Sequence, residues 1–234
     1  MLERFDCEQN TPEWLEARRG LITASAMSDV LAKGQGKTRQ TYMAKLIAER
    51  VTGMTSCNFY NDDMMRGHDA EPYAQKTYEK AAGVKVENVG FFRNFAEIGG
   101  VGYSPDGVIG DDGLVEFKSR ADHVQVKYLL GLEKIPSANT KQVQTGLWVT
   151  GRKWCDYVCF NDYLPPFIRR IERDEKLISE MKAEVILLNK EIEVGAERIM
   201  QMIIECQAMP EARESDDIIG DFLSGKTEIR DVRA

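Results

Sequence analysis

The sequence predicts a mixed α/β fold, and three observations support this class. Capping residues and amphipathic patterns indicate helices within residues 11–83. β-Branched and aromatic runs, separated by turn residues, follow between residues 84 and 161, with one more helical pattern among them. A long amphipathic stretch then covers residues 174–206. Helices before, within and after a group of strands are typical of a mixed central sheet flanked by helices.

The first expected helix has clear signals at both ends. In "TPEWLEARRG", Thr11 is a good N-cap, Pro12 occupies the first helical position and Gly20 is a C-cap. We therefore expect a short helix that turns Trp14 inward and carries Arg18 near its end.

Three more helices are expected before the strands. "ITASAMSDVLAKG" offers Thr23 or Ser25 as the cap of a second short helix. "TRQTYMAKLIAERVTG" is amphipathic and ends at Gly53. "MMRGHDAEPYAQKTYEKAAG" is also typical of a helix, with Pro72 inside it or at its true start.

The expected strands are rich in β-branched and aromatic residues. They cover residues 84–94, 97–110, 113–119 and 152–161, and residues 166–173 are a candidate further strand. A helix that begins at the Ser137 cap and ends at Gly151 lies between the third and the fourth of these strands.

The chain length fits one sizeable domain better than two small ones, because 234 residues can bury a real core. We expect a single domain over residues 1–207. The last part, residues 208–234, is acidic and turn-rich around a short apolar patch, so we expect a flexible end or a docking segment there.

Charge and cysteine usage narrow the class of protein. A formal charge of −7 speaks against a general polyanion-binding surface, so contact with nucleic acid must be local or helped by metal. The 5 cysteines have irregular spacing, which predicts reduced packing residues instead of disulfides or a zinc site. No apolar run approaches the roughly 20 residues of a membrane helix, and the acidic start has no signal-peptide layout, so we expect a cytoplasmic protein.

The stretch "GGVGYSPDGVIGDDGLVEFKSR" carries the clearest chemical pattern. Asp106 lies on a Pro-Asp-Gly turn, and Glu116 and Lys118 lie two residues apart in an expected strand. If the turn begins a hairpin, alternation places Glu116 and Lys118 on one face and turns Phe117 into the core. We therefore expect the two acids and the lysine to converge.

Two carboxylates held close together repel unless a proton or a cation separates them. Hard oxygen ligands suit Mg²⁺ or Mn²⁺, and the backbone carbonyl of Phe117 is a candidate further ligand beside Asp106 and Glu116. Such a site hydrolyses phosphodiesters, with Lys118 acting on the water or on the developing charge. The alternative is a surface hairpin in which Glu116 and Lys118 form a weak solvated ion pair.

These residues match the PD-(D/E)XK nuclease pattern, as "SPDG" followed by "VEFKS". Four further stretches resemble the phage lambda exonuclease, or YqaJ-like viral recombinase, family: "EWLEARRGLITAS", "RGHDAEPYA", "KQVQTGLWVTG" and "IERDEK". The resemblance covers about residues 10–176 in order. It implies a restriction-endonuclease-like core, with Asp106 and Glu116 as metal ligands and Lys118 as the catalytic lysine.

The resemblance adds two groups of site residues. Glu71 is similar to an additional acid near the metal, and Gln142 to an active-site glutamine; without the resemblance, both are polar residues on helix surfaces. Arg18, Ser25 and Ser104 match positions that receive a terminal 5′ phosphate. This chemistry is sensible, because a guanidinium binds phosphate bidentately and hydroxyls complete the pocket.

Some positions depart from the family pattern. Asn139 replaces a tyrosine three residues before the Gln-Val-Gln, and Arg66 replaces a tryptophan. In the family, an apolar residue separates the two strands of the DNA duplex, and its counterpart here falls near Met64. The stretch beyond about residue 208 has no counterpart in the family pattern.

The resemblance implies a 5′→3′ exonuclease that uses Mg²⁺, as two ions for which Mn²⁺ can substitute, and digests one strand of double-stranded DNA to 5′ mononucleotides. It further implies a ring-shaped homotrimer, a single-strand annealing protein as partner, and a phage or prophage origin in a bacterial host. Two alternatives stay open: an endonuclease on the same core, and a non-catalytic scaffold that binds DNA ends for recombination.

Overall fold

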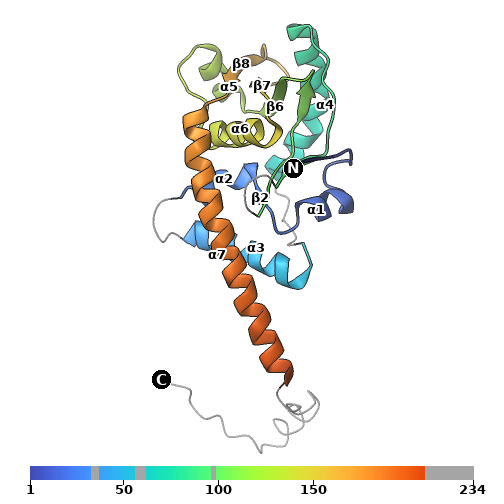
Figure 1. The fold of residues 1–234 in the computed structure, drawn as a ribbon. Coiled ribbons are helices and arrows are strands. Elements are labelled where there is room, and N and C mark those ends of the chain that lie inside the picture. The colour runs from blue at the N-terminus through green and yellow to red at the C-terminus, as the bar shows by residue number, and fades with distance from the viewer. Residues whose placement is uncertain (33–36, 56–61, 96–98, 209–234) are drawn as a thin grey trace, which may run out of the picture. The chain divides into compact units, whose positions relative to one another are not determined.

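A computed structural model describes residues 1–32, 37–55, 62–95 and 99–208, and the side chains of residues 62–71 are outside this description. In chain order, its helices and strands (Figure 1) are β1 Leu2–Phe5, α1 Pro12–Arg18, β2 Ile22–Thr23, a 3₁₀ turn Ala24–Ala26, α2 Met27–Val30, α3 Lys37–Thr52, α4 Asp62–Ala82, β3 Phe91–Asn94, β4 Val101–Tyr103, β5 Gly107–Ile109, β6 Gly113–Ser119, α5 Asp122–Leu129, α6 Ser137–Thr150, β7 Trp154–Phe160, β8 Phe167–Glu172 and α7 Glu175–Ala208. The predicted mixed α/β class and the long C-terminal helix are confirmed.

The strands form two mixed four-stranded sheets. The first has the order β1-β3-β4-β2, in which β2 is parallel to β4 and the other pairs are antiparallel. The second has the order β5-β6-β7-β8, in which β6 and β7 are parallel and the outer pairs are antiparallel. The expected hairpin is therefore present, with Ile109 opposite Gly113 at its closed end.

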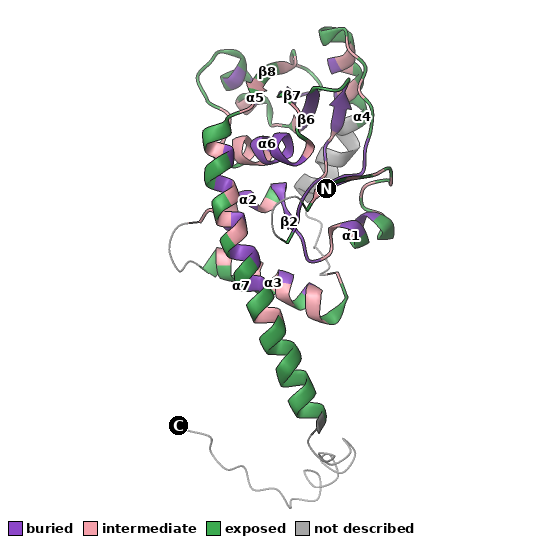
Figure 2. Cartoon of the chain, in the orientation of Figure 1, coloured by how far each residue is buried: buried purple, intermediate pink, exposed green. Residues whose placement is uncertain are grey.

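Opposite faces of the second sheet pack on different helices. Val115, Phe117 and Val158 share one buried cluster with Tyr78 of α4. Leu114, Cys155, Tyr157 and Cys159 belong to the main core, together with Val143 and Leu147 of α6. The second half of α6, residues 143–149, is buried (Figure 2). Because side chains alternate along a strand, the sheet separates α4 from α6 and presents different residues to each.

The N-terminal part confirms one helix and corrects another. Thr11 caps α1 by accepting a hydrogen bond from the Trp14 amide, and Trp14 is buried as expected. The second short helix does not begin at Thr23 or Ser25. Pairing of β2 with β4 keeps residues 22–23 extended, a 3₁₀ turn follows, and α2 begins only at Met27.

Besides β2, two further elements had not been expected. Strand β1 pairs antiparallel with β3, about 90 residues away, and helix α5 follows the acid–lysine strand. Within the expected strand at residues 84–94, only residues 91–94 form a strand, while Glu87 makes an isolated bridge with Val108. The candidate strand at residues 166–173 is confirmed as β8.

The chain divides into two compact units, residues 1–196 and residues 197–234. Within the first, Ile178, Met181, Val185, Leu188 and Ile192 line the buried side of α7. None of the helices in the described part of the chain is long and apolar enough to cross a membrane. The expected boundary at residue 207 stays a prediction, and residues 209–234 lie outside the described part.

A buried ionic cluster joins α4 to the second sheet. The carboxylate of Asp156, on β7, is only 4% exposed. It accepts two hydrogen bonds from Arg170 of β8, at 2.8 and 2.9 Å, and one from the Tyr78 hydroxyl, at 2.7 Å. Burial and the negative charge of Asp156 both raise the pKa of Tyr78, so its hydroxyl remains a donor.

We expect Tyr78→Phe to lower the free energy of unfolding by about 1–2 kcal/mol, because a buried carboxylate loses one of its donors. Urea denaturation measures the change. Tyr73→Phe, on the same helix but 66% exposed, is the matched control and should change stability little. Equal effects of the two substitutions would contradict the role of the Tyr78 hydroxyl.

Candidate active site

The acid–lysine motif lies on β6 and on the turn before β5. Glu116 and Lys118 point to the α6 side of the sheet, whereas Phe117 packs on the α4 side, as alternation predicts. The Nζ atom of Lys118 lies 2.5 Å from Oε1 of Glu116. The predicted convergence of these two residues is confirmed by the geometry of the described chain.

The Glu116 carboxylate is fully buried, with 0% of the residue exposed. Its Oε1 atom accepts hydrogen bonds from Lys118 Nζ and, at 2.6 Å, from Gln142 Nε2 of α6. Its Oε2 atom accepts one from the Tyr103 hydroxyl of β4, at 3.2 Å. A buried charge requires such donors, and here they come from three different elements.

Asp106 is fixed to the backbone of the same strand. Its Oδ2 atom accepts a hydrogen bond of 2.6 Å from the amide of Phe117. The pairing of β5 with β6 ends at Val115, so this amide has no partner strand on that side. Since the N–H and C=O of one strand residue point to the same side, the Phe117 carbonyl also faces Asp106.

The negative charges of the two acids shift the pKa values of neighbouring side chains. Burial by itself lowers the pKa of Lys118, but the carboxylates of Glu116 and Asp106 outweigh it and raise the pKa above its ordinary value. Burial and the charge of Glu116 raise the pKa of Tyr103 well above its ordinary range. Lys118 therefore remains a cation and Tyr103 a neutral donor.

The donor set fits a hard divalent cation. Asp106 and Glu116 supply carboxylate oxygens, and Phe117 supplies a carbonyl on the side of Asp106, which are the ligand types that Mg²⁺ and Mn²⁺ prefer. Within the described residues no three His, Cys, Asp or Glu side chains gather. The predicted third acid, Glu71, lies in the first half of α4, where the side chains of residues 62–71 are outside the described part. Met64 and Arg66 lie in the same segment.

A second polar cluster forms around Ser104, two residues before Asp106. Ser104 Oγ accepts hydrogen bonds from Trp14 Nε1 at 2.9 Å and from Arg18 Nη1 at 3.1 Å. The Arg18 guanidinium lies over the Trp14 ring, 3.9 Å from its centroid. Arg18 and Ser104, two of the three residues predicted to bind phosphate, are therefore neighbours.

The third residue, Ser25, lies in the 3₁₀ turn after β2. Its hydroxyl is 3.4 Å from the Thr23 hydroxyl. Its place in a phosphate pocket stays a prediction.

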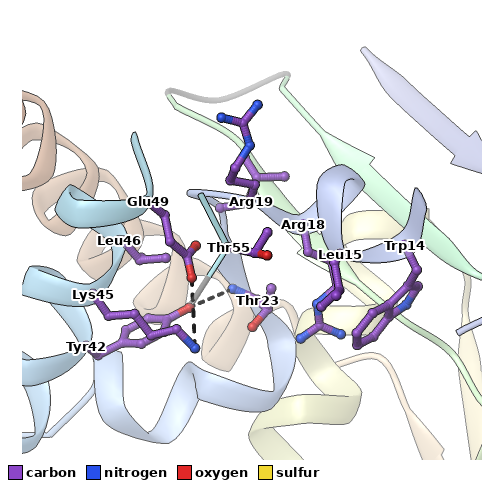
Figure 3. Close-up of a pocket in the computed structure, with 11 residues that line it drawn as sticks. Trp14, Leu15, Arg18, Arg19, Thr23, Tyr42, Lys45, Leu46, Glu49 and Thr55 are labelled. Carbon is purple, nitrogen blue, oxygen red and sulfur yellow. Dashed lines mark hydrogen bonds and ion pairs between the residues drawn. The ribbon is translucent and has the colours of Figure 1, made fainter. Parts of the chain in front are cut away.

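Arg18 also lines a small pocket of about 50 Å³ between α1, β2 and α3 (Figure 3). Tyr42 and Lys45 of α3 line the same pocket. The Tyr42 hydroxyl accepts a hydrogen bond of 3.0 Å from the Thr23 amide, and burial raises the pKa of Tyr42. The charged residues of its lining are three cations, Arg18, Arg19 and Lys45, and one anion, Glu49.

Sequence reasoning missed Tyr103, Tyr42 and the contact between Trp14 and Ser104. Tyr103 stands directly before the Ser-Pro-Asp-Gly motif, which could have drawn attention to it, but its partner is 13 residues away. Trp14 was expected to face inward only as a core residue. Its indole N–H gives it a polar contact that hydrophobicity does not indicate.

The sequence matches the family model of the YqaJ-like viral recombinase domain over residues 13–153. Among curated proteins, none matches the sequence. Among solved structures, the chain is similar to an alkaline exonuclease, LHK-Exo, from Laribacter hongkongensis, alone and in complex with dAMP. Both comparisons give 38% identity and a TM-score of 0.75, and cover 84% of this chain and 100% of that one.

A phage-related exonuclease from Haemophilus somnus 129PT is similar in fold, with a TM-score of 0.57 and 14% identity over 80% of this chain and 99% of that one. The family model covers more than half of the present chain, and LHK-Exo is matched over its whole length. The chain therefore belongs to the YqaJ-like viral recombinase family.

Proposed function

We propose that the chain is a Mg²⁺-dependent exonuclease that digests one strand of double-stranded DNA from its 5′ end and releases 5′ mononucleotides. That it is a nuclease follows from its family and from its 38% identity to an exonuclease along the full length of that protein. Polarity, metal and substrate are the proposed part. They are supported by the residues of the two clusters.

The observation that carries the proposal is the buried Glu116 carboxylate with Lys118 and Gln142 on the same oxygen. Asp106, Glu116 and the Phe117 carbonyl would hold Mg²⁺. When bound, Mg²⁺ supplies polarisation of the phosphodiester and a water of lowered pKa. Lys118 adds a fixed positive charge where negative charge develops on the phosphate. Gln142 and Tyr103 orient the Glu116 carboxylate.

The Ser104 cluster supports the choice of the 5′ end. Arg18 is held between the Trp14 ring and the Ser104 hydroxyl, so its guanidinium is oriented before any substrate binds. A guanidinium binds phosphate bidentately. Because Ser104 is only two residues from Asp106, a 5′ phosphate at Arg18 would place the first phosphodiester near the metal ligands. The dAMP in the LHK-Exo complex is a nucleoside monophosphate, the class of product expected here.

The partners stay predictions of the same proposal. A ring-shaped homotrimer around the duplex would keep a protein of net charge −7 on DNA by topology, without a general basic surface. A single-strand annealing protein would take up the 3′ strand that digestion exposes. A cytoplasmic, phage or prophage origin also stays a prediction.

Linear duplex DNA, labelled separately at each 5′ and 3′ end, tests the proposed function. With Mg²⁺ present, we expect mononucleotides from the 5′ label first, and supercoiled circular DNA should stay intact. Asp106→Asn should abolish digestion, because the site loses a carboxylate ligand. Nicking of the circular DNA would favour the endonuclease instead, and DNA binding without any digestion would favour the non-catalytic scaffold.

We expect Lys118→Ala to keep Mg²⁺ affinity but to lose about 10²- to 10³-fold in rate, the scale for removal of one electrostatic stabiliser. Calorimetry and single-turnover digestion measure the two quantities. Lys85→Ala is a control, because the Lys85 side chain is 95% exposed. Loss of metal affinity in Lys118→Ala would mean that the lysine serves only to hold Glu116 in place.

The end preference tests Arg18. We expect wild-type protein to prefer 5′-phosphorylated over 5′-hydroxyl duplexes by about tenfold or more, because a bidentate charge-assisted contact distinguishes them. Arg18→Ala should erase most of this preference. Arg18→Lys should restore it only in part, because an ammonium cannot bind phosphate through two parallel hydrogen bonds as a guanidinium does. Arg4→Ala, which removes a surface arginine paired with Asp6, should leave it unchanged. Equal wild-type rates on both ends would disprove the phosphate pocket.

A further inference from the structure

Arg120 directly follows the acid–lysine strand and is a partly buried cation. Its Nη2 atom donates a hydrogen bond of 3.3 Å to the Tyr157 hydroxyl. Its Nε atom is buried and has no hydrogen-bond partner. Among the residues that the structure describes, no carboxylate forms an ion pair with Arg120. The described chain therefore surrounds this guanidinium with neutral groups, the Tyr157 hydroxyl and the Cys159 thiol, and with no carboxylate.

Two other arginines of the described chain, the partly buried Arg152 and the more exposed Arg170, make more hydrogen bonds within the protein. Arg170 forms a bidentate pair with Asp156. Arg152 donates to two backbone carbonyls, those of Gly110 and Gly113. Burying part of a charge without an acceptor is costly. Packing therefore does not account for Arg120. Its buried Nε is out of reach of an external anion, but Nη1 makes no hydrogen bond within the described chain and can donate to an anion from outside the protein.

The position of Arg120 places it next to the nuclease site. Its amide continues the pairing of β6 with β7 by donating to the Phe160 carbonyl, so alternation along the strand extends through it. Lys118 and Arg120, two residues apart, therefore lie on the same side of the sheet.

The hydroxyl that holds Arg120 belongs to the same neighbourhood. Tyr157 pairs in register with Glu116 across β6 and β7. Its hydroxyl also accepts a hydrogen bond of 3.1 Å from Asn139, which lies three residues before Gln142 on one face of α6. Arg120 and Asn139 thus meet at the Tyr157 hydroxyl, just as Lys118 and Gln142 meet at the Glu116 carboxylate.

From this arrangement we infer that Arg120 binds a backbone phosphate of the digested strand on the 3′ side of the scissile bond. The inference rests on the proposed function and adds a contact to the same site. Ser104, which holds Arg18, comes two residues before Asp106, on the β5 side of β6. Arg120 is held by Tyr157 of β7, the strand on the other side of β6. A strand with its 5′ phosphate at Arg18 and its first linkage at Glu116 would therefore continue toward Arg120.

Neutral methylphosphonate linkages test this contact. Duplexes with a 5′ phosphate carry one such linkage each, placed at successive positions of the digested strand, and fluorescence anisotropy in Ca²⁺ buffer measures binding. For wild-type protein, we expect one position on the 3′ side of the scissile bond to weaken binding by about tenfold, as loss of a charge-assisted contact does. Arg120→Gln should weaken binding of unmodified DNA similarly and abolish the effect of that linkage.

Arg152→Gln is the matched control, because Arg152 is also partly buried but donates to carbonyls at the opposite end of β6. It should keep the wild-type methylphosphonate profile. Arg120→Lys should restore part of the effect. Thermal unfolding separates a structural role: Arg120→Gln should not lower the midpoint, since the guanidinium has no ion pair within the described chain to lose.

The outcomes distinguish failure of the proposed Arg120 contact from failure of the proposed exonuclease function. A wild-type protein that digests DNA from the 5′ end, with a methylphosphonate profile that Arg120→Gln leaves unchanged, overturns the Arg120 contact alone. A lowered unfolding midpoint together with an unchanged profile makes Arg120 a structural residue and also overturns it. A wild-type protein that does not digest DNA overturns the function on which the contact rests.

Discussion

The burial of the Glu116 carboxylate constrains the rest of the structure. A charge with no exposed surface is tolerated only if donors surround it, and Lys118, Gln142 and Tyr103 supply them. These donors come from β6 of one sheet, β4 of the other, and α6, which contacts strands of both sheets. The same carboxylate therefore fixes how these elements meet, and it is a ligand of the proposed cation site.

The incomplete pairing of β5 with β6 is the second condition for the site. The ladder stops at Val115, so the backbone of Phe117 is left without a partner strand on one side. Asp106 accepts its amide, and its carbonyl stays on the same side. A longer β5 would satisfy both groups and remove the site. The proposed chemistry thus depends on a strand, β5, that begins only at Gly107, within the Pro-Asp-Gly turn.

To bind the proposed DNA substrate, a protein of net negative charge needs cationic side chains placed locally at the site. Arg18 is oriented by an aromatic ring and a serine hydroxyl, and Arg120 by a tyrosine hydroxyl. Arginines that serve the fold, such as Arg170 and Arg39, pair with carboxylates. A neutral partner alone does not mark a binding residue, because Arg152 is held by two backbone carbonyls. What distinguishes Arg18 and Arg120 is that they lie beside the proposed nuclease site.

Features that depend on residues close together in the chain could be predicted from the sequence. Alternation placed Glu116 and Lys118 opposite Phe117, and capping signals located α1. The sequence could not identify β1, because that strand is held by pairing with β3, nor the late start of α2, which follows from the pairing of β2 with β4. Gln142 was placed at the site by resemblance alone, and only the packing of α6 on the sheet joined it to Glu116. The contacts of three further residues join different elements: Tyr103, Tyr157 and Arg120. They could not be predicted, because burial and strand register are properties of the packed chain that no local pattern encodes.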